Sequence, residues 1–109
     1  MKISFDQINL TELKNFYGGE GALIANMHVD ECGKIMRGCL KKGSSIGLHR
    51  HDTSSEIIFI LSGSGKAVCN GVEELLSAGD CHYCKKGSDH TLINIGVDDL
   101  CFYAVVPVQ

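Results

Sequence analysis

Residues 43–63 read GSSIGLHRHDTSSEIIFILSG and combine glycine turns, two nearby histidines and an apolar run. Side chains alternate between the two faces of a strand, so His49 and His51 should point the same way and Arg50 the other way. Glu56 follows a short polar turn, and its strand can run back beside the histidine strand. Two imidazoles on one face with a carboxylate nearby are a natural chelating set for a divalent transition metal.

A second pattern lies at residues 79–94, which read GDCHYCKKGSDHTLIN. His90 begins a later apolar stretch that could close the same site from a facing strand. Together the two patterns resemble those of the cupin family. The first cupin motif runs Gly, five residues, His-x-His, four residues, Glu, six residues, Gly, and residues 43–63 match it throughout. The second runs Gly, five residues, Pro-x-Gly, two residues, His, three residues, Asn, and residues 79–94 match it except that Lys85 replaces the proline.

The resemblance implies an all-β fold, a conical β-barrel of jelly-roll topology also called a double-stranded β-helix. It implies a single cupin domain over residues 1–109, with the motifs at 43–63 and 79–94. It further implies that one divalent transition metal is bound by His49, His51, Glu56 and His90, with open positions for substrate or water. Such a set accepts iron, manganese, nickel or zinc. The alternative is a metal-free cupin whose pocket uses these residues as hydrogen-bonding groups.

The rest of the chain supports an all-β fold without reference to any family. Short apolar runs alternate with glycine-containing turns, and Asn70-Gly71 is typical of a two-residue hairpin. This regular spacing of short strands and turns is typical of a β-sandwich or β-barrel. We expect strands at residues 22–29, 34–41, 46–51, 56–61, 66–69, 72–76, 82–84, 90–95 and 100–106.

The N-terminal segment predicts one short helix before the first of these strands. Asn9 could cap it, with Glu12 reaching back to the cap, as in a capping box. An apolar stripe suited to core packing is formed by Leu10, Leu13 and Phe16. The helix can last only two turns, because the glycines at 18 and 19 should end it.

Strand alternation also suggests which side chains line the barrel near the metal ligands. Ile58 and Ile60 share the strand face of the carboxylate ligand, and Leu92 shares that of the histidine ligand two residues before it. Tyr103 is a further candidate. Its hydroxyl could contact a substrate, but such a tyrosine is more often a core residue with a satisfied hydroxyl.

Four further positions around the motifs carry separate expectations. Asn94 could hydrogen-bond near the base of the barrel and steady a ligand strand, or simply face a turn. Lys85 could leave the loop before the histidine ligand more mobile or place an ammonium near the pocket mouth. His28 and His82 match no motif position, so we interpret them as packing or solvated residues.

The chain contains six cysteines: Cys32, Cys39, Cys69, Cys81, Cys84 and Cys101. Most lie in apolar stretches, and cysteine behaves there as a small hydrophobic residue, so we expect reduced thiols. Cys81 and Cys84 have the spacing of a redox or zinc pair. On an extended strand, however, they should face opposite sides, which weakens both interpretations.

Composition limits the partners that this chain can have. A length of 109 residues predicts one domain, and a net charge of −3 argues against nucleic acid, which needs a clustered basic face. No apolar run approaches the roughly 20 residues that span a bilayer. The first residues lack the apolar centre of a signal peptide, so a cytoplasmic protein is expected.

These observations predict a metalloenzyme that acts on a small organic substrate, with dioxygenase, isomerase, lyase and decarboxylase chemistry left open. The alternative is a non-catalytic cupin that binds or senses a small molecule or metabolite. A homodimer is also expected, because Val72, Leu75, Leu76 and residues 105–108 offer more apolar surface than a small barrel can hide.

Overall fold

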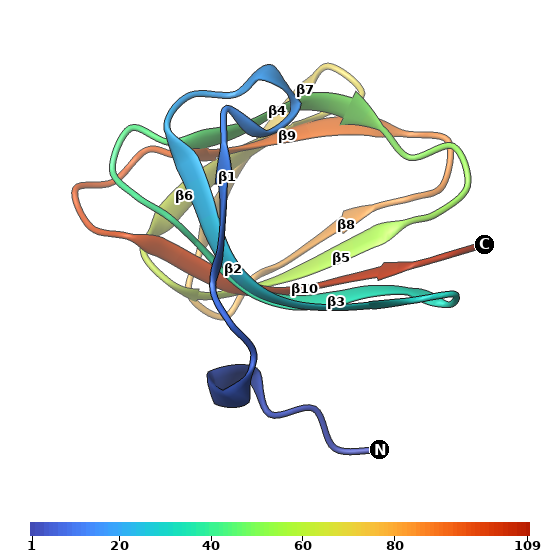
Figure 1. Ribbon diagram of the computed structural model, residues 1–109. Coiled ribbons are helices and arrows are strands. Elements are labelled where there is room, and N and C mark those ends of the chain that lie inside the picture. The colour runs from blue at the N-terminus through green and yellow to red at the C-terminus, as the bar shows by residue number, and fades with distance from the viewer.

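The computed structural model describes residues 1–109 as two antiparallel sheets that face each other (Figure 1). The six-stranded sheet contains, in spatial order, β1 (Thr11–Lys14), β2 (Ala22–Asp30), β3 (Gly33–Leu40), β10 (Leu100–Pro107), β5 (Glu56–Ser62) and β8 (Cys81–Cys84). The four-stranded sheet contains β4 (Ser45–Arg50), β9 (Asp89–Asn94), β6 (Ser64–Cys69) and β7 (Val72–Ser77). Two 3₁₀ turns, η1 (Phe5–Gln7) and η2 (Phe16–Gly18), precede β2.

The expected all-β fold is confirmed, and β2 to β10 coincide with the nine predicted strands to within one or two residues. The hairpin between β6 and β7 has the predicted turn, since Asn70 and Gly71 both have positive φ values of 50° and 80°. A two-residue turn with two positive φ angles matches the right-handed twist of the flanking strands.

The predicted N-terminal helix is wrong in place and in kind, because helical backbone is limited to the two 3₁₀ turns. Residues of the expected helix form β1, which pairs with β2 so that Leu13 lies opposite Leu23. The pairing lets Leu13 pack against the core, and it satisfies backbone groups that a two-turn helix leaves open. Asn15, with a positive φ of 50°, then turns the chain away from the sheet.

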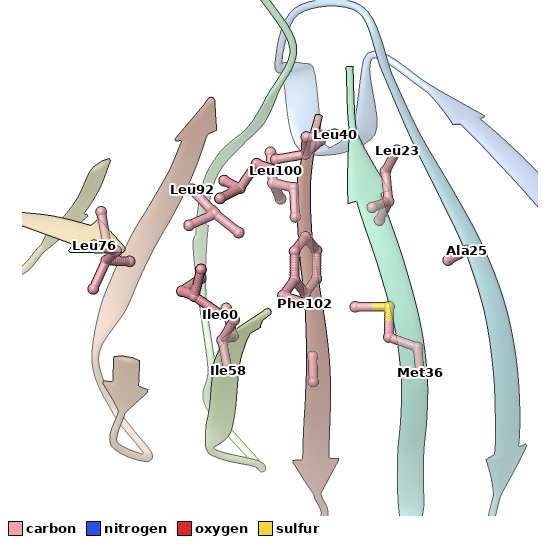
Figure 2. Close-up of a cluster of buried hydrophobic side chains, with 13 residues drawn as sticks. Leu23, Ala25, Met36, Leu40, Ile58, Ile60, Leu76, Leu92, Leu100 and Phe102 are labelled. Atoms are coloured by element: carbon pink, nitrogen blue, oxygen red, sulfur yellow. The ribbon is translucent and has the colours of Figure 1, made fainter. Parts of the chain in front are cut away.

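One hydrophobic core fills the space between the sheets (Figure 2). Leu76 and Leu92 from the four-stranded sheet pack with Ile58, Ile60 and Phe102 from the six-stranded sheet. The interior is divided along the strands, because the inward-facing residue of β5 that precedes these isoleucines is the buried carboxylate Glu56. The apolar cluster therefore fills the middle of the barrel, and the end that contains Glu56 holds a group of buried polar side chains.

The cysteines behave differently from the expectation of six reduced thiols. Cys39 on β3 and Cys101 on β10 form a disulfide. They lie directly opposite each other in the sheet with Cα atoms 4.2 Å apart. Such an adjacent pair in antiparallel strands brings the two sulfur atoms together, which the spacing of the residues in the sequence could not reveal.

The thiols of Cys81 and Cys84 are free, and they face opposite sides of β8 as strand alternation predicts. Cys81 is exposed and Cys84 is buried. Burial, together with the nearby Cys69 thiol, raises the pKa of Cys84 to about 12, so this thiol stays protonated at neutral pH. The two residues therefore do not form a chelating or redox pair. None of the helical turns is long and apolar enough to cross a membrane.

Candidate metal centre

Three strands from both sheets bring the four predicted ligands together at the polar end of the barrel. His49 lies on β4 directly opposite His90 on β9, and Glu56 begins β5 in the facing sheet. His51 follows the end of β4. Arg50 between the two histidines is exposed whereas His51 is buried, which confirms that the histidines share the inner face.

The ligand atoms of these four residues converge on one point. The Nε2 atom of His90 lies 2.9 Å from Oε1 of Glu56 and 3.1 Å from the Nε2 atoms of both His49 and His51. Oε1 of Glu56 is 3.3 Å from Nε2 of His51 and 3.9 Å from Nε2 of His49. All four atoms lie within 4.8 Å of one another. Two ligands at right angles, each about 2.1 Å from a metal, are separated by about 3 Å, so the spacing suits one ion.

Hydrogen bonds on the far side of the rings orient these nitrogen atoms. Nδ1 of His49 lies 2.8 Å from the carbonyl oxygen of Gly47, which can only accept, so the ring proton is on Nδ1. Nδ1 of His51 lies 2.8 Å from the hydroxyl of Ser54. A neutral His49 therefore directs the lone pair of Nε2 toward the Glu56 carboxylate. Acceptors that face each other in this way are favourable only with a cation between them, so the residues fit a bound metal.

Electrostatics keep the carboxylate charged and one of the rings neutral. Burial alone would raise the pKa of Glu56, but the three imidazoles packed around its carboxylate outweigh this effect and hold the pKa well below its ordinary value. Burial lowers the pKa of His90 despite the opposing effect of the Glu56 charge. At neutral pH, an ionised carboxylate and a neutral imidazole are the protonation states that metal ligation requires.

A cavity of about 270 Å³ opens over the cluster and is lined by three of the ligands, His49, His51 and Glu56. Lys34 contributes positive charge to its wall, where Arg50 is paired with Asp52. This volume lies just below the range of drug-sized ligand pockets, so it suits a small molecule.

One wall of the cavity comes from η2, whose Tyr17 ring stacks on His49 with centroids 4.1 Å apart. The segment can approach β4 because Gly47 has no side chain. A Cβ atom at Gly47 would lie 2.1 Å from the backbone oxygen of Tyr17. A hydrogen bond from the Ser45 amide to the Glu20 carbonyl, 2.9 Å long, ties the two segments together.

The other residues singled out in the sequence lie farther from the ligands. Ile58, Ile60 and Leu92 are core residues. The Asn94 amide donates to the carbonyl oxygens of Leu40 and Asp98, both at 2.9 Å, and so holds the turn before β10.

Tyr103 and Lys85 do not line the cavity. Tyr103 is partly exposed and stacks on Phe5 with ring centroids 5.5 Å apart. Its neighbours Phe102 and Ala104 are buried, so alternation along β10 directs Tyr103 outward, which corrects the expectation that it lines the barrel. Lys85 is exposed in the turn after β8.

Several residues of the site were not identified from the sequence. The sequence pattern places Phe16 on the apolar stripe of a helix and Lys34 in an ordinary strand and indicates no role for Tyr17, yet all three line the cavity. His82 was interpreted as a packing or solvated residue. It is buried as a packing residue would be, but it also contacts Nδ1 of His90 at 2.9 Å. Its inward position on a predicted strand was the one available signal.

Comparison with known proteins agrees with this fold and site. The sequence model of the cupin domain family matches residues 36–106. The oxalate-binding protein of Thermotoga maritima is 32% identical over 112 residues, which cover 97% of this chain and 93% of that protein. The crystal structure of a predicted oxalate decarboxylase from Thermotoga maritima superposes with a TM-score of 0.93 at 30% identity and covers both chains completely.

A cupin 2 conserved barrel domain protein from Salinispora arenicola has a TM-score of 0.73 at 27% identity, covering 97% of this chain and 87% of that one. The family match spans more than half of the chain and contains all four convergent ligands. This chain therefore belongs to the cupin family.

Proposed function

We propose that this protein binds a small chelating dicarboxylate of the oxalate type at a divalent metal held by His49, His51, Glu56 and His90. The observation that carries the proposal is the small cavity directly over the four convergent donor atoms. The choice of oxalate as the ligand type is supported by the similarity of this chain, over nearly its full length, to a protein named for oxalate binding.

The charge balance of the site favours an anionic ligand. When bound, a divalent metal supplies a net positive charge and open coordination positions, because the four residues contribute only one negative charge. Lys34 adds positive charge to the cavity wall, while the charge of Arg50 is balanced by Asp52. Two adjacent carboxylate groups could occupy neighbouring positions, whereas a neutral or cationic molecule would gain nothing from this wall. Iron, manganese, nickel and zinc all suit the donor set.

The residues around the cavity favour binding over rapid turnover. Asp52 and Glu56 are its only carboxylates, and Asp52 is exposed and paired with Arg50 at 2.8 Å. Glu56 would be occupied as a metal ligand and could not also act as a proton donor. Cleavage of the carbon–carbon bond of oxalate releases carbon dioxide and needs a proton to complete formate, and no free carboxylic acid stands ready to supply it. A metalloenzyme remains the second candidate, favoured by a cavity that leads directly to the metal ligands.

Calorimetric titration of metal-loaded protein with oxalate tests the proposal. We expect saturable binding of one oxalate per chain, and much weaker binding of formate, which cannot chelate through two carboxylates. The metal-free protein and His49→Ala are the controls that should bind neither. Oxalate heats that are the same with and without metal would contradict the proposal. Release of formate and carbon dioxide during the titration would identify an enzyme.

A further inference from the structure

A second buried imidazole lies behind His90, on the side away from the other ligands. His82 on β8 is 1% exposed, and its Nε2 atom lies 2.9 Å from Nδ1 of His90. The two rings stack with centroids 5.2 Å apart. On its other side, Nδ1 of His82 is hydrogen-bonded to the carboxylate of Glu74 on β7. Glu74 is about half exposed, so the three side chains form a line from the metal centre to the surface.

The outermost group of this line fixes the direction of each hydrogen bond. An ionised carboxylate can only accept, so Glu74 places the ring proton of His82 on Nδ1 and leaves a lone pair on Nε2. That lone pair accepts the Nδ1 proton of His90. Nε2 of His90 then carries no proton and faces the other donor atoms, as ligation requires. Without an acceptor at Nδ1, His90 could place its proton on Nε2 and block the site.

The line also crosses between the two sheets where their edges meet. Glu74 and His90 belong to the four-stranded sheet, while His82 belongs to the six-stranded sheet, opposite Ile58. Strand alternation separates Glu74 from its neighbour Glu73, which is exposed and pairs with Lys66 at 3.5 Å on the surface. Only Glu74, and not the adjacent Glu73, therefore directs its carboxylate toward His82.

We propose that Glu74 and His82 are positioning residues that lock His90 in its metal-binding tautomer and thereby tighten metal binding. The inference rests on the metal-binding part of the proposed function and is independent of oxalate. Hydrogen-bonding partners behind a histidine ligand typically contribute ten- to a hundredfold to metal affinity. A line of two such partners, ending in a carboxylate, gives this histidine a fixed orientation that the other two ligands obtain from Gly47 and Ser54.

Three variants and two measurements test the inference. Competition titration with Zn²⁺ should show the dissociation constant rising about ten- to a hundredfold in His82→Leu, and at least about threefold in Glu74→Gln. Glu73→Gln makes the same change of charge one residue away and should leave the constant unchanged. Nitrogen-15 NMR of the metal-free protein at neutral pH should find the His90 proton on Nδ1 in the wild type and partly on Nε2 in both line variants.

Each result decides the inference. It is overturned if the wild-type His90 proton resides on Nε2, or if His82→Leu weakens Zn²⁺ binding while Glu74→Gln changes neither readout, because packing alone would then explain the effect. Glu74 lies at the surface, so its isosteric variant should fold even if His82→Leu does not. Failure of the wild type to bind oxalate would refute the proposed ligand and leave both measurements intact. Failure to bind Zn²⁺ would refute the metal site, and the NMR result would still test the tautomer.

Discussion

Glu56 explains why four polar side chains can be buried together at one end of a small barrel. It is the only anion among the four ligand groups, and the three imidazoles surround its Oε1 atom at distances between 2.9 and 3.9 Å. Burial of an unpaired carboxylate would be costly. The surrounding histidines and the positive charge of a metal, when one is bound, therefore stabilise the buried Glu56 carboxylate. The site is therefore cooperative, and loss of one member should weaken binding by all.

Removal of one histidine ligand should strongly reduce metal binding. His49→Ala and His90→Ala each delete one nitrogen donor, so bound metal should fall at least about tenfold, as measured by elemental analysis of protein purified without chelator. His28→Ala is the matched control, since His28 is bonded to Asp30 near the β2–β3 turn and should leave the metal content unchanged. Full metal content in both ligand variants would refute the assignment.

The stability of the metal-free protein should fall as the pH falls below 6.5, the ordinary pKa of histidine. The pKa of His90 is lowered in the folded protein, so below pH 6.5 the unfolded chain binds more protons than the folded one. Proton uptake then favours unfolding, and stability is lost as the pH drops through the lowered pKa. The pKa of Glu56 is also lowered, which adds a second loss below its ordinary value of 4.5.

Thermal unfolding of chelator-treated protein across this pH range measures the effect. The melting temperature should be nearly constant at neutral pH and should decrease first in the histidine range and again in the carboxylate range. His90→Gln should lack the first decrease. A melting temperature that rises on acidification through 6.5 would contradict the assigned direction of the His90 pKa.

At the level of strands and turns, the nine strands β2 to β10 could be predicted because their signals are local. Glycine turns and alternating apolar residues mark each strand, and the spacing of the two motifs is maintained by strand length. β1 could not be predicted, because pairing with β2 rather than local propensity decides its structure. The same holds for Tyr17, which reaches His49 only because η2 packs on β4.

The four ligands could be predicted as a set, whereas the residues behind them could not. Motif spacing encodes His49, His51, Glu56 and His90, which converge as expected. The contact between His82 and His90 depends on how the two sheets close, which no short-range pattern records. The disulfide is a similar case, since Cys39 and Cys101 are 62 residues apart and meet only through the register of β3 and β10.

The disulfide between β3 and β10 should contribute to stability. Closing a loop of this length restricts the unfolded chain and is worth about 4 kcal/mol in the chain-entropy model. Reductant, or the double variant Cys39→Ala/Cys101→Ala, should therefore lower the free energy of unfolding by up to that amount. Thiol titration in denaturant should count four free cysteines before reduction and six after it. Six before reduction would show that the bond does not form.

The outer surface of the whole molecule differs in part from the one expected to drive dimerisation. Val72 and Leu75 are exposed on the edge strand β7 as expected, but Leu76 is buried and residues 105–107 lie in β10 between β3 and β5. Further exposed apolar side chains lie on the outer face of the six-stranded sheet. Phe59 lies opposite the partly exposed Tyr103 on the neighbouring strand, and Leu61 and Tyr83 are exposed beside it on β5 and β8.

This face leads us to retain the prediction of a homodimer and to assign its contact. A contiguous aromatic patch on a small barrel is costly in water, and a second copy with the same patch would cover it symmetrically. Light scattering at micromolar concentration should give twice the chain mass of 11.8 kDa. Phe59→Lys should give the monomer mass, because it places an ammonium group at the centre of the patch. Leu48→Lys changes a residue on β4 that is even more exposed than Phe59 and should remain dimeric. A monomeric wild type would refute the dimer, and a dimeric Phe59→Lys would refute this face as its contact.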